Sequence, residues 1–141
     1  MKAIINGRFI LPQEIIEGQA LTFDKMLEGF SDPDQLPAHT QIIDAGGAYV
    51  APGFLNLHIH GCGGCDAMDG TREALATMSR LQASTGVTGF LPTTMTCSQE
   101  AIGKALSAIR EARGHEPGAD ILGANLEGPF ISETYKGAQK A

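Results

Sequence analysis

The feature that most constrains the fold is a repeated order of strand and helix in the second part of the chain. Strand-like runs at 53–60, 87–91 and 121–127 are separated by segments with helical spacing near 71–85 and 99–112. Parallel strands need a crossover of a dozen or more residues, commonly a helix, so this order predicts a parallel sheet with both helices on one side. Such units build either a doubly wound sheet or an eight-stranded barrel.

Residues with capping preferences mark both predicted helices. Thr71 can cap the first helix, Glu73 suits its positive N-terminal end, and Gly86 can end it. Ser98 is the expected cap of the second helix. The side chains expected on the buried sides are Leu75, Met78 and Leu81 or Gln82 in the first helix, and Ile102, Ala105, Leu106 and Ile109 in the second.

The strand at 53–60 carries a pair of histidines. Because successive side chains of a strand alternate, His58 and His60 are expected on one face, about 7 Å apart along the chain. A single metal ion with bonds near 2 Å can accept both imidazoles. On the same reasoning, Phe54 and Asn56 share the histidine face, and the helices are expected to cover the other. That other face carries Leu55, Leu57 and Ile59.

The third strand favours a barrel. Its polar row ends in Glu127, as the polar row of the first strand ends in the two histidines. Barrel enzymes carry their sites at the C-terminal ends of the strands, where His58, His60 and Glu127 would converge across the second strand. A dinucleotide-binding sheet would instead need Gly-x-Gly-x-x-Gly leading into a helix, and the glycines at 61–64 lack that spacing.

The motif Cys62-x-x-Cys65 allows several interpretations. With His58 and His60 it could form a closed four-ligand zinc site, and alone it could be a redox pair. A redox pair is favoured at a helix N-terminus, and here the helix starts several residues later. We therefore expect a flexible glycine loop with incidental cysteines, and a buried structural Cys97.

Residues 1–50 read as short strands of a small β-domain without chemistry of its own, followed by an α/β domain at 51–141. Asn6-Gly7 predicts a two-residue hairpin turn with positive φ at both positions. The polar segment 29–40 reads as a loop, with His39 at the surface. His115 is expected in a second solvated loop.

Composition excludes two classes of partner. The net charge of -6, without a cluster of Lys and Arg, argues against nucleic acid. No apolar run approaches the ~18–20 residues that span a bilayer, so we expect no membrane association. The absence of a signal-peptide pattern and the odd count of three cysteines favour a cytoplasmic protein.

Several segments resemble a known family. The run 51–61 is similar to the first barrel strand of the amidohydrolase superfamily. The segments 60–69, 86–94 and 126–139 resemble N-acetylglucosamine-6-phosphate deacetylases, and Leu-Glu-Gly-Pro-Phe is the most specific block. The resemblance implies a (β/α)8 barrel, with its first three βα units at 51–141, preceded by strands of a small β-sandwich at 1–50.

The resemblance also implies a function. The family hydrolyses the N-acetyl group of N-acetylglucosamine 6-phosphate to glucosamine 6-phosphate and acetate. It implies one or two divalent metal ions, zinc or iron, with Glu127, His58 and His60 as ligands, and substrate contacts from Ala138 and Gln139. Two more histidine ligands and an aspartate base belong to later strands. We therefore expect no catalytic base within 1–141, an inactive chain when alone, and a homodimer at full length.

Two alternatives remain open. One is a different amidohydrolase, such as a deaminase or a cyclic-amide hydrolase, which the Leu-Glu-Gly-Pro-Phe block disfavours. The other is a non-catalytic βαβ protein with a structural zinc held by His58, His60, Cys62 and Cys65. The polar row that ends in Glu127 disfavours this second alternative.

Overall fold

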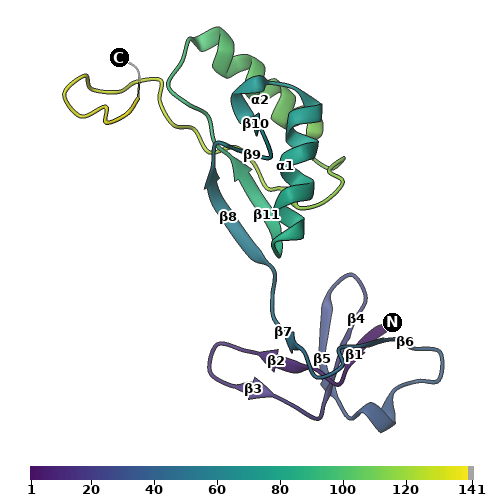
Figure 1. Ribbon diagram of the computed structural model, residues 1–141. Helices are drawn as coiled ribbons and strands as arrows, with labels where there is room; N and C mark the ends of the chain where they lie inside the picture. Colours follow the sequence, from purple (N-terminus) through teal and green to yellow (C-terminus); the bar gives the residue numbers. More distant parts are fainter. Residues whose placement is uncertain (140–141) are drawn as a thin grey trace. The chain divides into compact units, whose positions relative to one another are not determined.

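The computed structural model describes residues 1–139, which form two compact units divided in the sequence between Pro52 and Gly53 (Figure 1). The first unit contains two small mixed sheets and a 3-10 turn, η1. One sheet has the order β5-β4-β1-β6, with bounds Leu27–Ser31, Ala20–Phe23, Lys2–Ile5 and Gln41–Asp44. The other has the order β3-β2-β7, with bounds Ile15–Ile16, Arg8–Ile10 and Tyr49–Val50, and η1 spans Pro33–Gln35.

The predicted hairpin at Asn6-Gly7 is wrong. β1 and β2 join different sheets, and of the two turn residues Asn6 has a positive φ, of 53°, whereas Gly7 does not. The Asn6 side chain donates to the Asp44 carboxylate at 3.0 Å, so this turn is tied to the end of β6. Gly7 is needed for close approach, because a Cβ there would lie 2.9 Å from Cγ2 of Val50. The predicted loop at 29–40 is also partly wrong, since β5 continues to Ser31.

The second unit is built on a parallel three-stranded sheet, as predicted. Its order is β12-β11-β8, with β8 at Phe54–Ile59, β11 at Val87–Pro92 and β12 at Asp120–Ile121. The crossover helices are α1 at Arg72–Ser84 and α2 at Gln99–Ala112. The predicted caps are confirmed, because Thr71 and Ser98 each accept a backbone N–H of the first turn at 3.2 Å.

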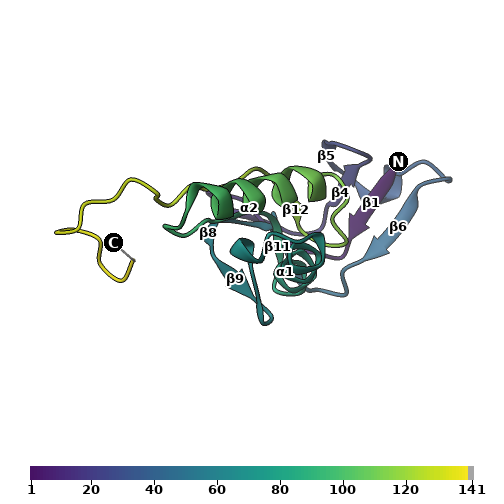
Figure 2. The ribbon, with the colours of Figure 1, turned by 90° about the horizontal axis from the view of Figure 1, so that it is seen from above.

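Both helices pack on one face of this sheet, and Figures 1 and 2 show them next to each other. Leu81 or Gln82 was expected on the buried side of the first helix, and the structure buries Gln82 and exposes Leu81. Helix α1 also holds the segment before β12, because the buried Ser79 hydroxyl donates to the Ala119 carbonyl at 2.9 Å and accepts from Gly118 N–H at 3.0 Å. The core cluster comprises Leu75, Met78, Phe90, Ala108, Ile109, Ala112, Ala119 and Ile121.

An extra residue in β8 changes which side chains face the helices. Asn56 pairs with Phe90 and Ile59 pairs with Pro92, so three steps along β8 match two along β11. Such a bulge breaks the strict alternation of faces. Asn56 therefore lies on the helix side, where its amide donates to Gln82 Oε1 at 2.9 Å, and Ile59 packs against the core cluster.

The prediction of which β8 side chains face the helices is therefore partly wrong. Leu55 and Leu57 do not lie under the helices, since they are 61% and 59% exposed. Because Ile59 faces the helices, alternation places its neighbours His58 and His60 on the opposite face, as predicted.

The third strand is shorter than predicted. β12 ends at Ile121, and the segment 122–127 contributes only an isolated parallel bridge between Thr93 and Asn125. Gly123 lies inside this segment and offers no side chain to pack, which weakens a strand. The segment still follows β11, because Asn125 N–H donates to the Pro92 carbonyl at 3.0 Å.

The loop predicted after His60 is an ordered hairpin. β9 (Gly61–Cys62) pairs antiparallel with β10 (Cys65–Asp66), and a short 3-10 turn, η2, follows at Ala67–Asp69. Among the described residues, no helix is long and apolar enough to cross a bilayer.

Candidate metal centre

Three donor atoms, two from the end of β8 and one from the segment after β12, meet at the C-terminal edge of the sheet in the second unit. The Nε2 atoms of His58 and His60 lie 3.2 Å apart. Oε2 of Glu127 lies 3.2 Å from the first nitrogen and 3.1 Å from the second. The predicted convergence of these side chains across β11 is therefore confirmed.

The spacing of the three donors fits a metal ion. Ligands at about 2.05 Å from a tetrahedral metal are separated from one another by about 3.3 Å. The three observed separations, 3.1 to 3.2 Å, are close to that edge length. The three donors could therefore share one metal ion.

The hydrogen-bond partners of the donors also suit a bound cation. Nδ1 of His60 lies 3.2 Å from the Thr93 carbonyl oxygen, which can only accept a hydrogen bond. A neutral His60 ring that donates to this carbonyl carries its proton on Nδ1, which leaves Nε2 facing Glu127 as an acceptor. Oε2 of Glu127 is buried without a hydrogen-bond donor among the described residues. A cation held between Nε2 of His60 and this oxygen would give both atoms a partner.

Thr93 links the histidine strand to β11 and is fully buried. Its hydroxyl accepts from Ile59 N–H at 2.9 Å, and its own N–H donates to the Ile59 carbonyl at 2.8 Å. Together with the His60 contact, these bonds fix the strand position and the ring orientation. Partners of this kind orient metal ligands and strongly influence metal affinity.

Two further polar side chains hold the other donors. The Asn125 amide lies 3.3 Å from Nδ1 of His58 and 3.4 Å from the Leu57 carbonyl. The Thr94 hydroxyl accepts from Glu127 N–H at 3.1 Å. Sequence reasoning placed Asn125 only in a polar row and gave Thr93 and Thr94 no role. Thr93 and Thr94 come immediately after Pro92 at the end of a parallel strand, and that position was the sequence signal that could have indicated a role at the site.

Gln139 is placed against the carboxylate rather than in open solvent. Its Nε2 donates to Oε1 of Glu127, and its Oε1 accepts from Thr96 N–H at 2.9 Å. This contact leaves the other oxygen, Oε2, facing the histidines. Ala138 borders a separate shallow pocket with Asp66, Met95 and Cys97.

The cysteines do not join the metal cluster. Among the described residues, the group suited to a metal is His58, His60 and Glu127, so the four-ligand zinc site with Cys62 and Cys65 is not formed. Both of these cysteines pack instead against the core under α1. The prediction of a buried Cys97 is wrong, because Cys97 is exposed just before the cap of α2.

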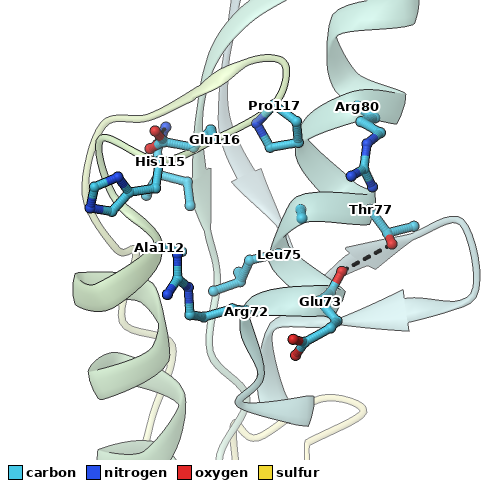
Figure 3. Close-up of a pocket in the computed structure, with 11 residues that line it drawn as sticks. Arg72, Glu73, Leu75, Thr77, Arg80, Ala112, His115, Glu116 and Pro117 are labelled. Carbon is cyan, nitrogen blue, oxygen red and sulfur yellow. Dashed lines mark hydrogen bonds between the residues drawn. The ribbon is translucent and has the colours of Figure 1, made fainter.

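Another pocket of similar volume lies elsewhere in the second unit, between α1 and the loop after α2 (Figure 3). It has a volume of about 380 Å³ and is bordered by Arg72 and Arg80 as well as by Glu73 and Glu116. The Thr77 hydroxyl donates to the Glu73 carbonyl at 3.0 Å on its wall. Since both charge signs line it and none of the three donors does, it has no part in the metal centre.

The sequence was compared with known proteins. No protein-family model matches the chain. The N-acetylglucosamine-6-phosphate deacetylase of Vibrio furnissii is 44% identical over 102 residues, which are 71% of this chain and 25% of that enzyme. The deacetylase of Bacillus subtilis (strain 168) is 38% identical over 116 residues, covering 79% of this chain and 27% of the enzyme. The chain therefore spans about a quarter of the length of these curated relatives.

Solved structures agree with this result. N-acetylglucosamine-6-phosphate deacetylase from Pasteurella multocida matches with a TM-score of 0.87 and 28% identity, over 99% of this chain and 37% of that one. The deacetylase from Thermotoga maritima matches with a TM-score of 0.75 and 27% identity, over 98% and 35%. The α/β fold and the sequence matches together confirm that the chain is related to N-acetylglucosamine-6-phosphate deacetylases, of which it covers about a quarter by length.

Proposed function

We propose that this protein acts in the metal-dependent hydrolysis of N-acetylglucosamine 6-phosphate to glucosamine 6-phosphate and acetate, a step of amino-sugar catabolism. The observation that carries the proposal is the donor triangle of His58, His60 and Glu127, with sides of 3.1 to 3.2 Å. It occurs in a chain 44% identical to a deacetylase over 102 residues.

The three donors would hold a divalent ion, for which imidazole and carboxylate ligands favour zinc or iron. When bound, such an ion lowers the pKa of coordinated water toward ~7 and polarises a carbonyl, which makes an amide hydrolysable at neutral pH. When Nδ1 of His60 donates to the Thr93 carbonyl, Nε2 is free to act as a ligand. A second ion near Glu127 belongs to the same proposal.

Gln139 has two roles in the proposal. Its amide holds Oε1 of Glu127, which turns Oε2 toward the histidines. We propose that Gln139, with Ala138, also contacts the sugar phosphate when it binds. Because its amide is already shared with Glu127 and Thr96 N–H, substrate contact would require a partial exchange of these hydrogen bonds.

Further proposals concern the whole protein. The parallel unit from Gly53 onward would be the first part of a (β/α)8 barrel, and the strands before Pro52 would be part of a β-sandwich domain. The exposed Leu55 and Leu57, on the face opposite the helices, suit the interior of such a barrel. We also propose a cytoplasmic homodimer, in which the catalytic base comes from a segment other than 1–141.

The proposal is tested by acetate release from N-acetylglucosamine 6-phosphate, with protein expressed from its complete reading frame. We expect turnover that a chelator abolishes and that Glu127→Gln lowers by more than 100-fold, whereas His39→Ala retains it. N-acetylgalactosamine 6-phosphate and a hydantoin are the comparison substrates. Faster turnover of the hydantoin would contradict the deacetylase assignment and favour a cyclic-amide hydrolase.

A further inference from the structure

We propose that Cys62 and Cys65 form a reversible disulfide that closes the β9-β10 hairpin directly after the second histidine of the metal centre. The two residues are paired in antiparallel register, so they lie opposite each other across the hairpin. Both are free thiols, and both are partly buried against the same core cluster. Their side chains therefore share one face of the hairpin.

The turn between the cysteines suits this closure. Gly63 and Gly64 have φ values of 64° and 76°, the signature of a tight two-residue hairpin turn. Directly opposite residues have Cβ atoms about 4.5–5.5 Å apart, whereas a disulfide needs about 3.5–4.5 Å. The distance between the two Cβ atoms must therefore shorten by about 1 Å, and the glycines at both turn positions allow the backbone to make that movement. Gly64 has open space around its α-carbon.

The surroundings of the thiols favour a pair over two independent cysteines. The Sγ of Cys62 lies 3.8 Å from Nε2 of Gln82 and 3.9 Å from the Met78 carbonyl, so its side chain is held toward α1, on the core side where Cys65 also packs. Both thiols remain partly exposed, which gives a small oxidant access. By contrast, Cys97 is exposed on a different segment and has no cysteine opposite it.

The chemical step is thiol–disulfide exchange with a low-molecular-weight disulfide. One cysteine thiolate attacks a sulfur of the reagent and releases one reagent thiol, leaving a mixed disulfide. The second cysteine then attacks the protein sulfur and releases the second reagent thiol. The protein loses two protons and two electrons, and the reagent takes them up to become two thiols.

The hairpin is joined to the metal centre through the backbone, since Ala67 N–H donates to the His60 carbonyl at 2.7 Å. The disulfide would therefore add a covalent link to a segment that begins at a proposed ligand. The disulfide inference does not depend on the proposed function, because its test involves neither metal nor substrate.

The test uses the Cys97→Ser variant, which removes the exposed third thiol. The folded protein is equilibrated with mixtures of oxidised and reduced glutathione, quenched in acid, alkylated and analysed by mass spectrometry. We expect both alkylation sites to disappear together without a glutathione adduct, and peptide mapping to join Cys62 to Cys65. The matched control, Cys62→Ser with Cys97→Ser, should instead take up one glutathione.

The contribution of the fold is tested by repeating the equilibration in guanidinium. The folded hairpin aligns the two thiols, so the disulfide should form more readily in the folded protein than in the unfolded chain. The ratio of oxidised to reduced glutathione at which half of the protein is oxidised should be at least about tenfold lower for the folded protein, a shift of about 30 mV. Equal midpoints would overturn the proposal. Two retained thiols, or two glutathione adducts on the folded protein, would overturn it as well.

Discussion

Replacing Thr93 with valine should weaken the link between the histidine strand and β11. The Thr93 hydroxyl accepts from Ile59 N–H at 2.9 Å and donates to the Leu91 carbonyl at 3.2 Å. Valine keeps the shape but leaves the partly buried Ile59 N–H without this partner. An unsatisfied buried group costs about 1–3 kcal/mol, so the free energy of unfolding of the second unit should fall by that amount.

The matched control is Thr88→Val in β11, the strand that Thr93 follows. The Thr88 hydroxyl is exposed and lies 3.5 Å from the Phe54 carbonyl, at the limit of a hydrogen bond. Its replacement should change stability by less than about 0.5 kcal/mol. Urea unfolding followed by helical circular dichroism measures the second unit, because α1 and α2 both lie there.

Thr93→Val should also reduce zinc affinity by about 10–100-fold, the usual effect of losing a group that orients metal ligands. Thr88→Val should leave zinc affinity unchanged. If Thr93→Val were as stable as the control and bound zinc equally well, Thr93 would not position the histidine strand.

Two further outcomes follow from other contacts. Ser79→Ala should lower the free energy of unfolding by about 2–4 kcal/mol, because it leaves two partially or fully buried backbone groups without a hydrogen-bond partner. Replacing the exposed Ser84 with alanine should lower it by less than about 0.5 kcal/mol in the same urea assay. Equal losses in the two variants would contradict the buried contact. The Gly46 N–H and the Asn6 amide lower the pKa of Asp44, so the stabilisation is present above the unfolded pKa and lost as pH falls through the lowered one. An NMR titration should show the pKa of Asp44 rising in Asn6→Ala, and an unchanged titration would be the contrary result.

Local signals in the sequence predicted the helices and the parallel order well. Thr71 and Ser98 cap helices within a residue of the expected starts, because capping depends on side chains next to the helix. The hairpin at Asn6-Gly7 failed for the opposite reason. Its turn preference was overridden by pairing of β1 with β4 and β6, which are distant in sequence.

The metal donors could be predicted, but the way they are held could not. His58, His60 and Glu127 stand at strand ends, where simple alternation and parallel pairing bring them together. The bulge in β8 depends on how the strand pairs with β11, so alternation misplaced Asn56 and Leu57. The contacts of Thr93 and Gln139 depend on side-chain geometry after folding, which periodicity does not encode.

The most direct test of the account is zinc binding by the 141-residue protein, measured by equilibrium dialysis with element analysis. We expect zinc bound by His58, His60 and Glu127, with affinity reduced by more than about 100-fold in His60→Ala and in Glu127→Gln, beyond the usual effect of an outer contact. His39→Ala and Cys62→Ser should retain the affinity of the parent protein. Zinc binding that survived loss of Glu127, or that disappeared with Cys62→Ser, would contradict the three-donor centre.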